Sequence, residues 1–171
     1  KLAIIIVFII IDLGCDGGNF TQRLLNYGEV VGLDISSNFI RSGKRRVKTA
    51  HFIISDVQKL PLRHASFDLV TCMEVLEHLP RPDLVVSESS RILRKSGRLL
   101  VSTPDDGKRL WRIIWFFWQN IGRGTIWQHK HIYNFGRQKI INLISPHFTK
   151  IVIDYVNFFL LFMIICERRE K

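Results

Sequence analysis

The stretch that decides the fold is IIIDLGCDGGNF, residues 9–20. It ends an apolar, β-branched run that begins at Leu2 and stops at an acidic, glycine-rich turn. This pattern is typical of a buried parallel strand followed by a tight loop. The ten apolar residues 2–11 are about half of what a helix needs to cross a bilayer. Asp12-Leu13-Gly14 is also a poor signal-cleavage site, so the sequence predicts a strand rather than a membrane span or a leader.

Outward from this strand, apolar runs and helical segments alternate along the chain. The alternation predicts right-handed βαβ units in an α/β, Rossmann-like fold, a seven-stranded mostly parallel sheet with helices on both faces. Residues 1–171 are expected to form a single domain. The last two strands leave no room for a helix between them, so an antiparallel C-terminal pair is expected. The expected strands are residues 3–12, 30–34, 51–55, 67–72, 97–103, 150–155 and 159–166, and the expected helices are residues 19–27, 36–48, 82–93 and 137–144.

The composition indicates a folded, basic protein. The 171 residues carry 25 Lys and Arg against 15 Asp and Glu, and most of the excess lies in residues 81–171. A positive second half favours acidic partners or an anionic membrane surface, although solvated helix faces give the same composition. The three cysteines are far apart and lack metal-ligand spacing. They predict free thiols in a reducing cytoplasm and no metal site.

Acidic residues close the first three expected strands: Asp12, Asp34 and Asp56. Ligands of open α/β sheets bind at this carboxyl edge, where Asp34 suits ribose hydroxyls and Asp56 suits an adenine amino group. A dinucleotide fingerprint needs a second glycine two residues after Gly14, but this chain has Asp16 there. A cationic sulfonium cofactor without phosphate therefore suits the acidic loop better than a dinucleotide.

A fourth stretch, residues 67–80, carries a buried strand into a polar segment with two glutamates and a histidine. Together, in this order and spacing, the four stretches resemble the class I S-adenosylmethionine-dependent methyltransferases, in particular the group similar to ubiquinone and menaquinone C-methyltransferases. The resemblance spans nearly the whole chain and rests on residues 12–18, Asp34, Asp56, and residues 67–79, 97–104 and 131–135.

The resemblance implies S-adenosylmethionine as the cofactor and methyl transfer as the activity. No catalytic base is assigned, but His78, Glu77 and His131 are candidates, since a histidine that titrates near neutrality suits removal of a proton from a phenol or an activated carbon. The cofactor-binding residues that the resemblance implies are Asp12, Gly14, Cys15, Asp16, Gly17, Gly18, Asp34, Ile35, Asp56, Val57, Met73 and Glu74.

Two departures from the family pattern keep other functions open. Asp16 replaces a usual glycine, although aspartate tolerates a left-handed backbone better than most residues. The helices that usually precede the first strand are also expected to be lacking. A binding or membrane-associated protein that retains the fold without activity is therefore the alternative. An NAD(P)-dependent oxidoreductase is the other, but it would need a glycine at position 16 and a Tyr-x-x-x-Lys pair.

An aromatic-rich insertion is expected at residues 104–130, where all four tryptophans lie. Trp111, Trp115 and Trp118 share one helical face, and arginines flank them. Such a segment favours a lid over a hydrophobic small-molecule or lipid-like acceptor, with peripheral membrane contact. A helix packed on the flank of the sheet is the alternative. A nucleic-acid partner is not expected, since no base-methylating Asn-Pro-Pro-Tyr-like motif is present, and the sequence leaves the oligomeric state open.

Overall fold

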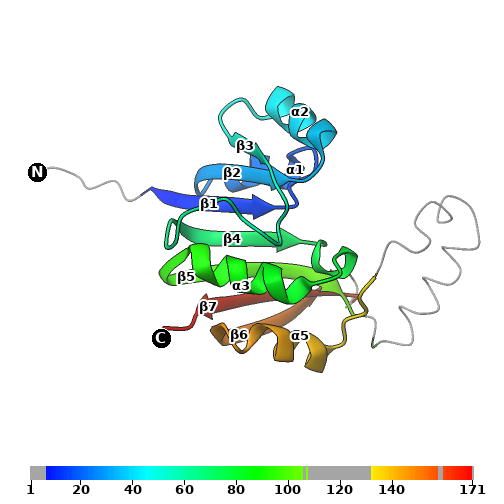
Figure 1. The fold of residues 1–171 in the computed structure, drawn as a ribbon. Helices are drawn as coiled ribbons and strands as arrows, with labels where there is room; N and C mark the ends of the chain where they lie inside the picture. Colours follow the sequence, from blue (N-terminus) through cyan, green and yellow to red (C-terminus); the bar gives the residue numbers. More distant parts are fainter. Residues whose placement is uncertain (1–6, 106, 108–131, 158–159, 171) are drawn as a thin grey trace, which may run out of the picture.

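The structure, a computed structural model, describes residues 7–105, 107, 132–157 and 160–170. Their strands form one seven-stranded sheet in the order β3-β2-β1-β4-β5-β7-β6 (Figure 1). The strands are β1 (Phe8–Leu13), β2 (Gly28–Asp34), β3 (His51–Ile54), β4 (Phe67–Met73), β5 (Leu93–Pro104), β6 (Phe148–Val156) and β7 (Leu161–Arg168). The helices are α1 (Asn19–Leu24), α2 (Ser37–Arg46), the 3₁₀ helix η1 (Leu76–His78), α3 (Pro82–Ile92) and α5 (Arg137–Ile144).

The strand directions confirm the predicted mostly parallel sheet. β1 lies at its centre and pairs in parallel with β2 on one side and β4 on the other. β7 runs antiparallel to both β5 and β6, so it is the reversed strand, and the expected antiparallel C-terminal pair is confirmed. The chain order reverses between β1 and β4, which makes their carboxyl ends the place where ligands of such sheets bind.

Neighbouring residues of β1 show that helices cover both faces. Ile10 packs with Leu24 of α1 and with Val30, whereas Ile11 belongs to the cluster that contains Val85 of α3. Successive side chains of a strand point to opposite faces, so α1 and α3 lie on opposite sides of the sheet. Figure 1 shows α3 and α5 together in front of the strands.

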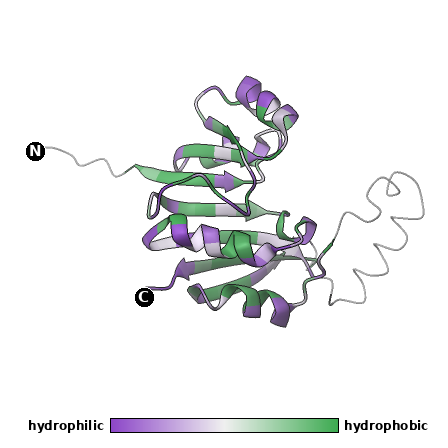
Figure 2. Ribbon diagram, viewed as in Figure 1, coloured by the Kyte–Doolittle hydropathy of each residue, from purple (hydrophilic) through white to green (hydrophobic). Residues whose placement is uncertain are grey.

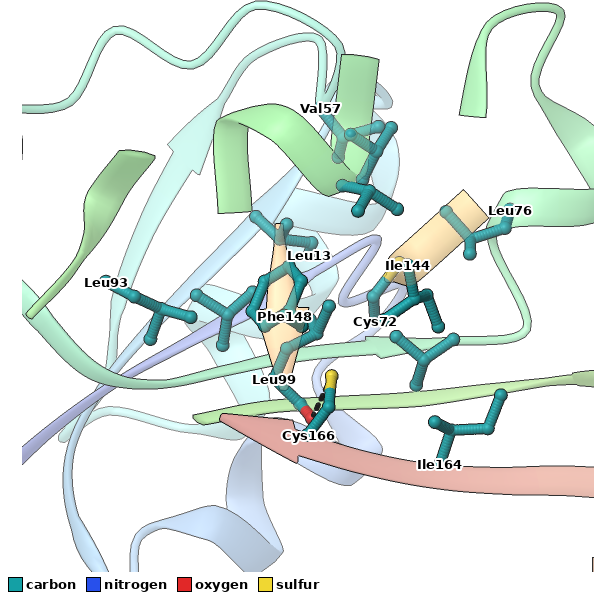
Figure 3. Close-up of a cluster of buried hydrophobic side chains, with 14 of the residues drawn as sticks. Leu13, Val57, Cys72, Leu76, Leu93, Leu99, Ile144, Phe148, Ile164 and Cys166 are labelled. Atoms are coloured by element: carbon teal, nitrogen blue, oxygen red, sulfur yellow. Dashed lines mark hydrogen bonds between the residues drawn. The ribbon is translucent and has the colours of Figure 1, made fainter. Parts of the chain in front are cut away.

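The larger core lies between the sheet and the layer of α3 and α5. Leu13, Cys72, Leu99 and Ile164 come from four strands, and Phe148 closes the cluster at the start of β6 (Figure 3). All five side chains are at most 1% exposed. Full burial of each large aliphatic or aromatic side chain stabilises the fold by about 1.5–3 kcal/mol. This core fixes the carboxyl ends of β1, β4 and β5 relative to one another.

Several predicted boundaries changed by a few residues, as at the start of β5. β5 begins at Leu93 rather than at residue 97, because Leu93 pairs with Phe67 before a register shift. The apolar run that begins at residue 151 forms most of β6 and β7, as expected from Asp154 and Asn157 within it. Within the described ranges, no helix is both long and apolar enough to cross a bilayer. Most of the predicted insertion, and residues 3–6 of the first expected strand, lie outside the described residues.

Candidate functional site

The loop after β1 turns back onto the end of β2. The backbone N–H groups of Gly14 and Cys15 both donate to the carbonyl oxygen of Leu33, at 2.8 and 3.0 Å. Gly14 has a φ of +69°, and a Cβ there would lie 2.4 Å from Cγ2 of Val75. Only glycine combines this left-handed angle with so close an approach. The loop is therefore held against β2 and against the segment that follows β4.

Asp34 joins this loop to the start of α2. Its Oδ2 accepts the N–H of Asp16 at 3.0 Å, and its Oδ1 accepts the N–H of Ser36 at 2.8 Å. Asp16 has a φ of +49°, so the prediction that aspartate can adopt the left-handed conformation here is confirmed. Ser36 is the N-cap of α2, since its Oγ accepts from Phe39 N. The end of β2 and the β1 loop thus share one carboxylate.

Asp12 lies beneath the loop and is 2% exposed. Its two oxygens accept hydrogen bonds from the hydroxyls of Thr21 and Thr71, each at 2.7 Å. Burial raises the pKa of Asp12, and the two threonine hydrogen bonds oppose that shift. In this structure Asp12 ties β1 to α1 and β4, which gives it a structural role. Direct contact between Asp12 and a ligand stays a prediction.

The end of β3 places Asp56 and Val57 in different surroundings. Asp56 is half-buried, and its Oδ1 accepts the N–H of Gln58 at 2.8 Å, which forms a turn. The Val57 side chain is 7% exposed and belongs to the main core (Figure 3). It therefore packs in the interior and does not line a surface where a ligand ring could bind. The exposed apolar residues at this edge are instead Ile35 and Ile54, at 71% and 57%.

The end of β4 turns sharply after Met73, which is partly buried. Glu74 has a φ of +55°, and its N–H donates to the carbonyl oxygen of Ser102 at 3.1 Å. The Ser102 hydroxyl in turn donates to Oε1 of Glu74 at 2.6 Å. Glu74 is exposed, so the carboxylate that β5 holds in place remains at the surface of the carboxyl edge.

The carboxyl edge of the sheet therefore brings the β1 loop, Asp34 and Glu74 together, with Asp56 on the neighbouring strand. A family model described as a methyltransferase domain matches residues 11–101, the part of the chain that contains all of these residues. The chain belongs to the class I S-adenosylmethionine-dependent methyltransferases. This agrees with the resemblance stated from the sequence.

Similar proteins share the domain but differ in extent. Ubiquinone biosynthesis O-methyltransferases from Coxiella burnetii (strain RSA 493) and from Photorhabdus laumondii are 31% and 30% identical over 99 and 108 residues. The two alignments cover 55% and 60% of this chain. They cover only 42% and 45% of the two relatives, so the chain matches less than half of each relative's length. The PH0226 protein of Pyrococcus horikoshii superposes with a TM-score of 0.78 at 23% identity, covering 97% of this chain and 84% of the other. The N-methyltransferase NodS of Bradyrhizobium japonicum was solved with S-adenosyl-L-homocysteine. It superposes with a TM-score of 0.71 at 17% identity, covering 96% of this chain and 79% of NodS. At these identities the two structures support the fold alone.

The three candidate bases lie in different places. Glu77 is 1% exposed, its Oε2 accepts from the Thr103 hydroxyl at 3.1 Å, and its carbonyl oxygen accepts from Ile132 N and Tyr133 N. It therefore anchors the returning chain to η1. His78 is half-buried at the end of η1, and His131 lies outside the described residues. A catalytic role for any of the three stays a prediction.

Sequence reasoning missed two polar residues near this site. Thr71 is a fully buried polar residue within the mostly apolar strand β4, and such a residue predicts a buried hydrogen-bond partner, here Asp12. Asp105 follows β5 as Asp34 follows β2, a signal that was available. It is 5% exposed and accepts hydrogen bonds from Gly107 N and from the Tyr155 hydroxyl.

A cavity of about 540 Å³ lies elsewhere. Phe8, Asp68 and Gly97 are among the residues that line it, and they lie at or near the amino ends of β1 and β4 and in the first half of β5. Phe8 and Leu13 are the two ends of β1, about 17 Å apart at the usual strand rise. This cavity is therefore separate from the carboxyl-edge site. Within the described residues, no three His, Cys, Asp or Glu side chains gather in a way that could hold a metal ion.

Proposed function

We propose that this chain binds S-adenosylmethionine at the carboxyl edge of β1, β2 and β3 and transfers its methyl group to a small-molecule acceptor. The observation that carries the proposal is the shared carboxylate of Asp34, which holds the loop after β1 against the start of α2. Family membership supports the cofactor, and NodS, solved with the demethylated product, supports it by analogy.

The residues at this edge fit such a cofactor chemically. A carboxylate oxygen has two acceptor sites, so Asp34 can accept ribose hydroxyls in addition to its two backbone donors. Ile35 and Ile54 offer exposed apolar surface for the base, and Asp56 offers an acceptor for an amino group. Glu74 adds negative charge, which suits the amino group and the sulfonium of the methionine part.

The proposed binding residues are those that the sequence implied, with one addition and two changes of role. Ile54 is added as an apolar contact. Asp12 supports the loop from below, and Val57 packs in the core. The remaining positions are Gly14, Cys15, Asp16, Gly17, Gly18, Asp34, Ile35, Asp56, Met73 and Glu74.

The bound cofactor supplies an electrophilic methyl group on a sulfonium, so the protein's task is binding and alignment. The Gly14 turn lets the loop pack closely against Val75, and the buried hydrogen bonds of Asp12 tie the end of β1 to its neighbours, so the loop is held in place for a ligand. Asp34 at the end of β2 and Glu74 after β4 would hold the cofactor from the two strands that flank β1. An acceptor that must lose a proton needs a base, and His78 is our candidate because it is only half-buried, whereas Glu77 of the same helix is 1% exposed.

The acceptor that we propose is hydrophobic or lipid-like. Ile132 and Tyr133 lie at the carboxyl edge, tied to Glu77 through their backbone N–H groups, and are 60% and 41% exposed. The aromatic-rich segment before them supports the same class from its sequence. The name of the Coxiella relative makes hydroxylated precursors of ubiquinone the first acceptors to test.

Titration calorimetry with S-adenosyl-L-homocysteine tests the cofactor site. Wild type is expected to bind in the micromolar range, and Asp34→Asn is expected to bind at least about 10-fold more weakly, because it loses a charge-assisted acceptor worth about 1.5–3 kcal/mol. Asp83→Asn is the matched control, since Asp83 is an exposed carboxylate paired with Arg81 on the surface. It should bind as wild type does.

The alternative is a protein that retains the fold without a working cofactor site. No heat of binding up to millimolar ligand, from folded wild-type protein, would favour that alternative and remove the proposed activity. If Asp34→Asn and Asp83→Asn lose the same affinity for S-adenosyl-L-homocysteine, the ligand binds at a place other than the one that we propose.

A further inference from the structure

The outer face of α2 carries a dense positive charge that the methyltransferase site does not use. Five exposed cations lie on or next to this helix within eight residues, and residues 35–48 contain no acidic side chain. Figure 2 shows the helix as one of the most hydrophilic parts of the ribbon. The cations are Arg41, Lys44, Arg45, Arg46 and Lys48.

The fold turns this charge outward. The opposite face of α2 packs Ile40 and Val47 against Phe52 of β3, and β3 is an edge strand of the sheet. A Cβ at Gly43 would lie 2.5 Å from the Phe52 ring, so the helix lies close against the strand. The α2 helix therefore lies at one end of the sheet (Figure 1), and its cations are exposed to solvent.

The cations are not neutralised within the described part of the chain. None of them forms an ion pair there. Arg41 donates to the carbonyl oxygen of Ser37 and to the side chain of Asn38, and Arg46 donates to the side chain of Asn19, so their partners are uncharged. The helix dipole favours cations in the last turn, which covers Lys44, Arg45 and Arg46. It does not account for Arg41 or for Lys48, so the set exceeds what helix stability needs.

An exposed aromatic side chain accompanies the charge. Phe39 on α2 is 47% exposed, whereas the exposed Ile35 belongs to the proposed cofactor site. A protruding helix with cations and an exposed aromatic ring suits the headgroup region of a bilayer, where both kinds of side chain are favoured. Phosphate groups of a nucleic acid would use the same cations, so RNA is the competing partner in the test.

We propose that the outer face of α2, with Phe39 at its amino-terminal end, docks the protein on an anionic phospholipid membrane. Each cation near such a surface contributes about a 5-fold increase in binding. Several cations together give reversible, salt-sensitive attachment, because exposed charges are screened over about 8 Å at physiological salt. The docking does not depend on cofactor binding, so it can be tested even where the methyltransferase proposal fails.

Co-sedimentation of the full chain with vesicles tests the proposal. The vesicles contain phosphatidylcholine alone or with about 30 mol% phosphatidylserine, at low and at physiological salt. Wild type is expected to sediment with the anionic vesicles and to stay in the supernatant when the vesicles are neutral. Lys44→Gln/Arg45→Gln is expected to lower the partition coefficient about 25-fold, and Phe39→Ala is expected to lower it about 3-fold.

The matched control is Lys95→Gln/Lys139→Gln, which removes the same net charge from exposed sites away from α2. It is expected to bind within about 3-fold of wild type. Unfolding curves of every variant exclude loss of fold. The proposal is overturned if wild type ignores anionic vesicles, if the α2 and control variants lose binding equally, or if wild type prefers poly(U) RNA to vesicles and Phe39→Ala leaves vesicle binding unchanged.

Discussion

Gly14→Ala puts a methyl group into the turn after β1, where the backbone and a neighbouring side chain both oppose it. The φ of +69° costs a residue with a Cβ about 1–2 kcal/mol. The new Cβ would also lie 2.4 Å from Cγ2 of Val75, and overpacking of this kind costs about 1–3 kcal/mol. The two effects arise from different atoms, so Gly14→Ala is expected to lower the free energy of unfolding by about 2–5 kcal/mol.

Val75→Ala separates the two costs. It removes the methyl groups that the new Cβ would meet, and leaves the left-handed backbone as it was. Urea unfolding of wild type, both single variants and the double variant gives the coupling between the two positions. The double variant is expected to be about 1–3 kcal/mol more stable than the sum of the single changes predicts. Additive losses would refute the contact between the turn and Val75, and an unchanged stability of Gly14→Ala would refute the strained turn itself.

Three further perturbations follow from buried polar groups. Burial raises the pKa of Asp12 above its unfolded value, so the folded state holds the proton more tightly than the unfolded state does. The stability of wild type relative to Asp12→Asn should therefore rise as the pH falls from 7 towards 4, as measured by urea unfolding. A difference in urea midpoints that stays constant over this pH range would contradict the prediction. Burial raises the pKa of the Cys15 thiol to about 12. At pH 8, Cys15 of the native protein should therefore react with iodoacetamide far more slowly than Cys15 of the urea-unfolded protein, as followed by mass spectrometry. Equal rates would mean that this thiol lies at the surface. Arg91→Ala should lower the free energy of unfolding, measured in urea, by about 2–4 kcal/mol. The reason is that Arg91 donates to the carbonyl oxygens of Leu60 and Leu62 and pairs with Glu88 at 2.7 Å. A loss below about 0.5 kcal/mol would mean that these contacts do not stabilise the fold.

Local pattern was enough for the elements and for the edge where ligands bind. Every expected strand and helix that falls within the described residues is present, because runs of β-branched residues and helical periodicity depend on near neighbours. Exceptions occur where distant pairing overrides a local signal. The expected strand begins at residue 97, and Ser96 before it does have a φ of +57°, yet β5 starts at Leu93 because Leu93 pairs with Phe67.

The sequence by itself determined the α/β class, the glycine turn after the first strand, and the placing of Asp12, Asp34 and Asp56 at one edge. These follow from strand endings, since the carboxyl ends of parallel strands meet. Only the tertiary structure decided what each carboxylate does. Asp12 is buried because Thr71, 59 residues away, comes from the adjacent strand, whereas Asp34 accepts from the loop of another strand. The insertion of β7 between β5 and β6 was also beyond the sequence, because strand order depends on which surfaces pack together and not on any single segment.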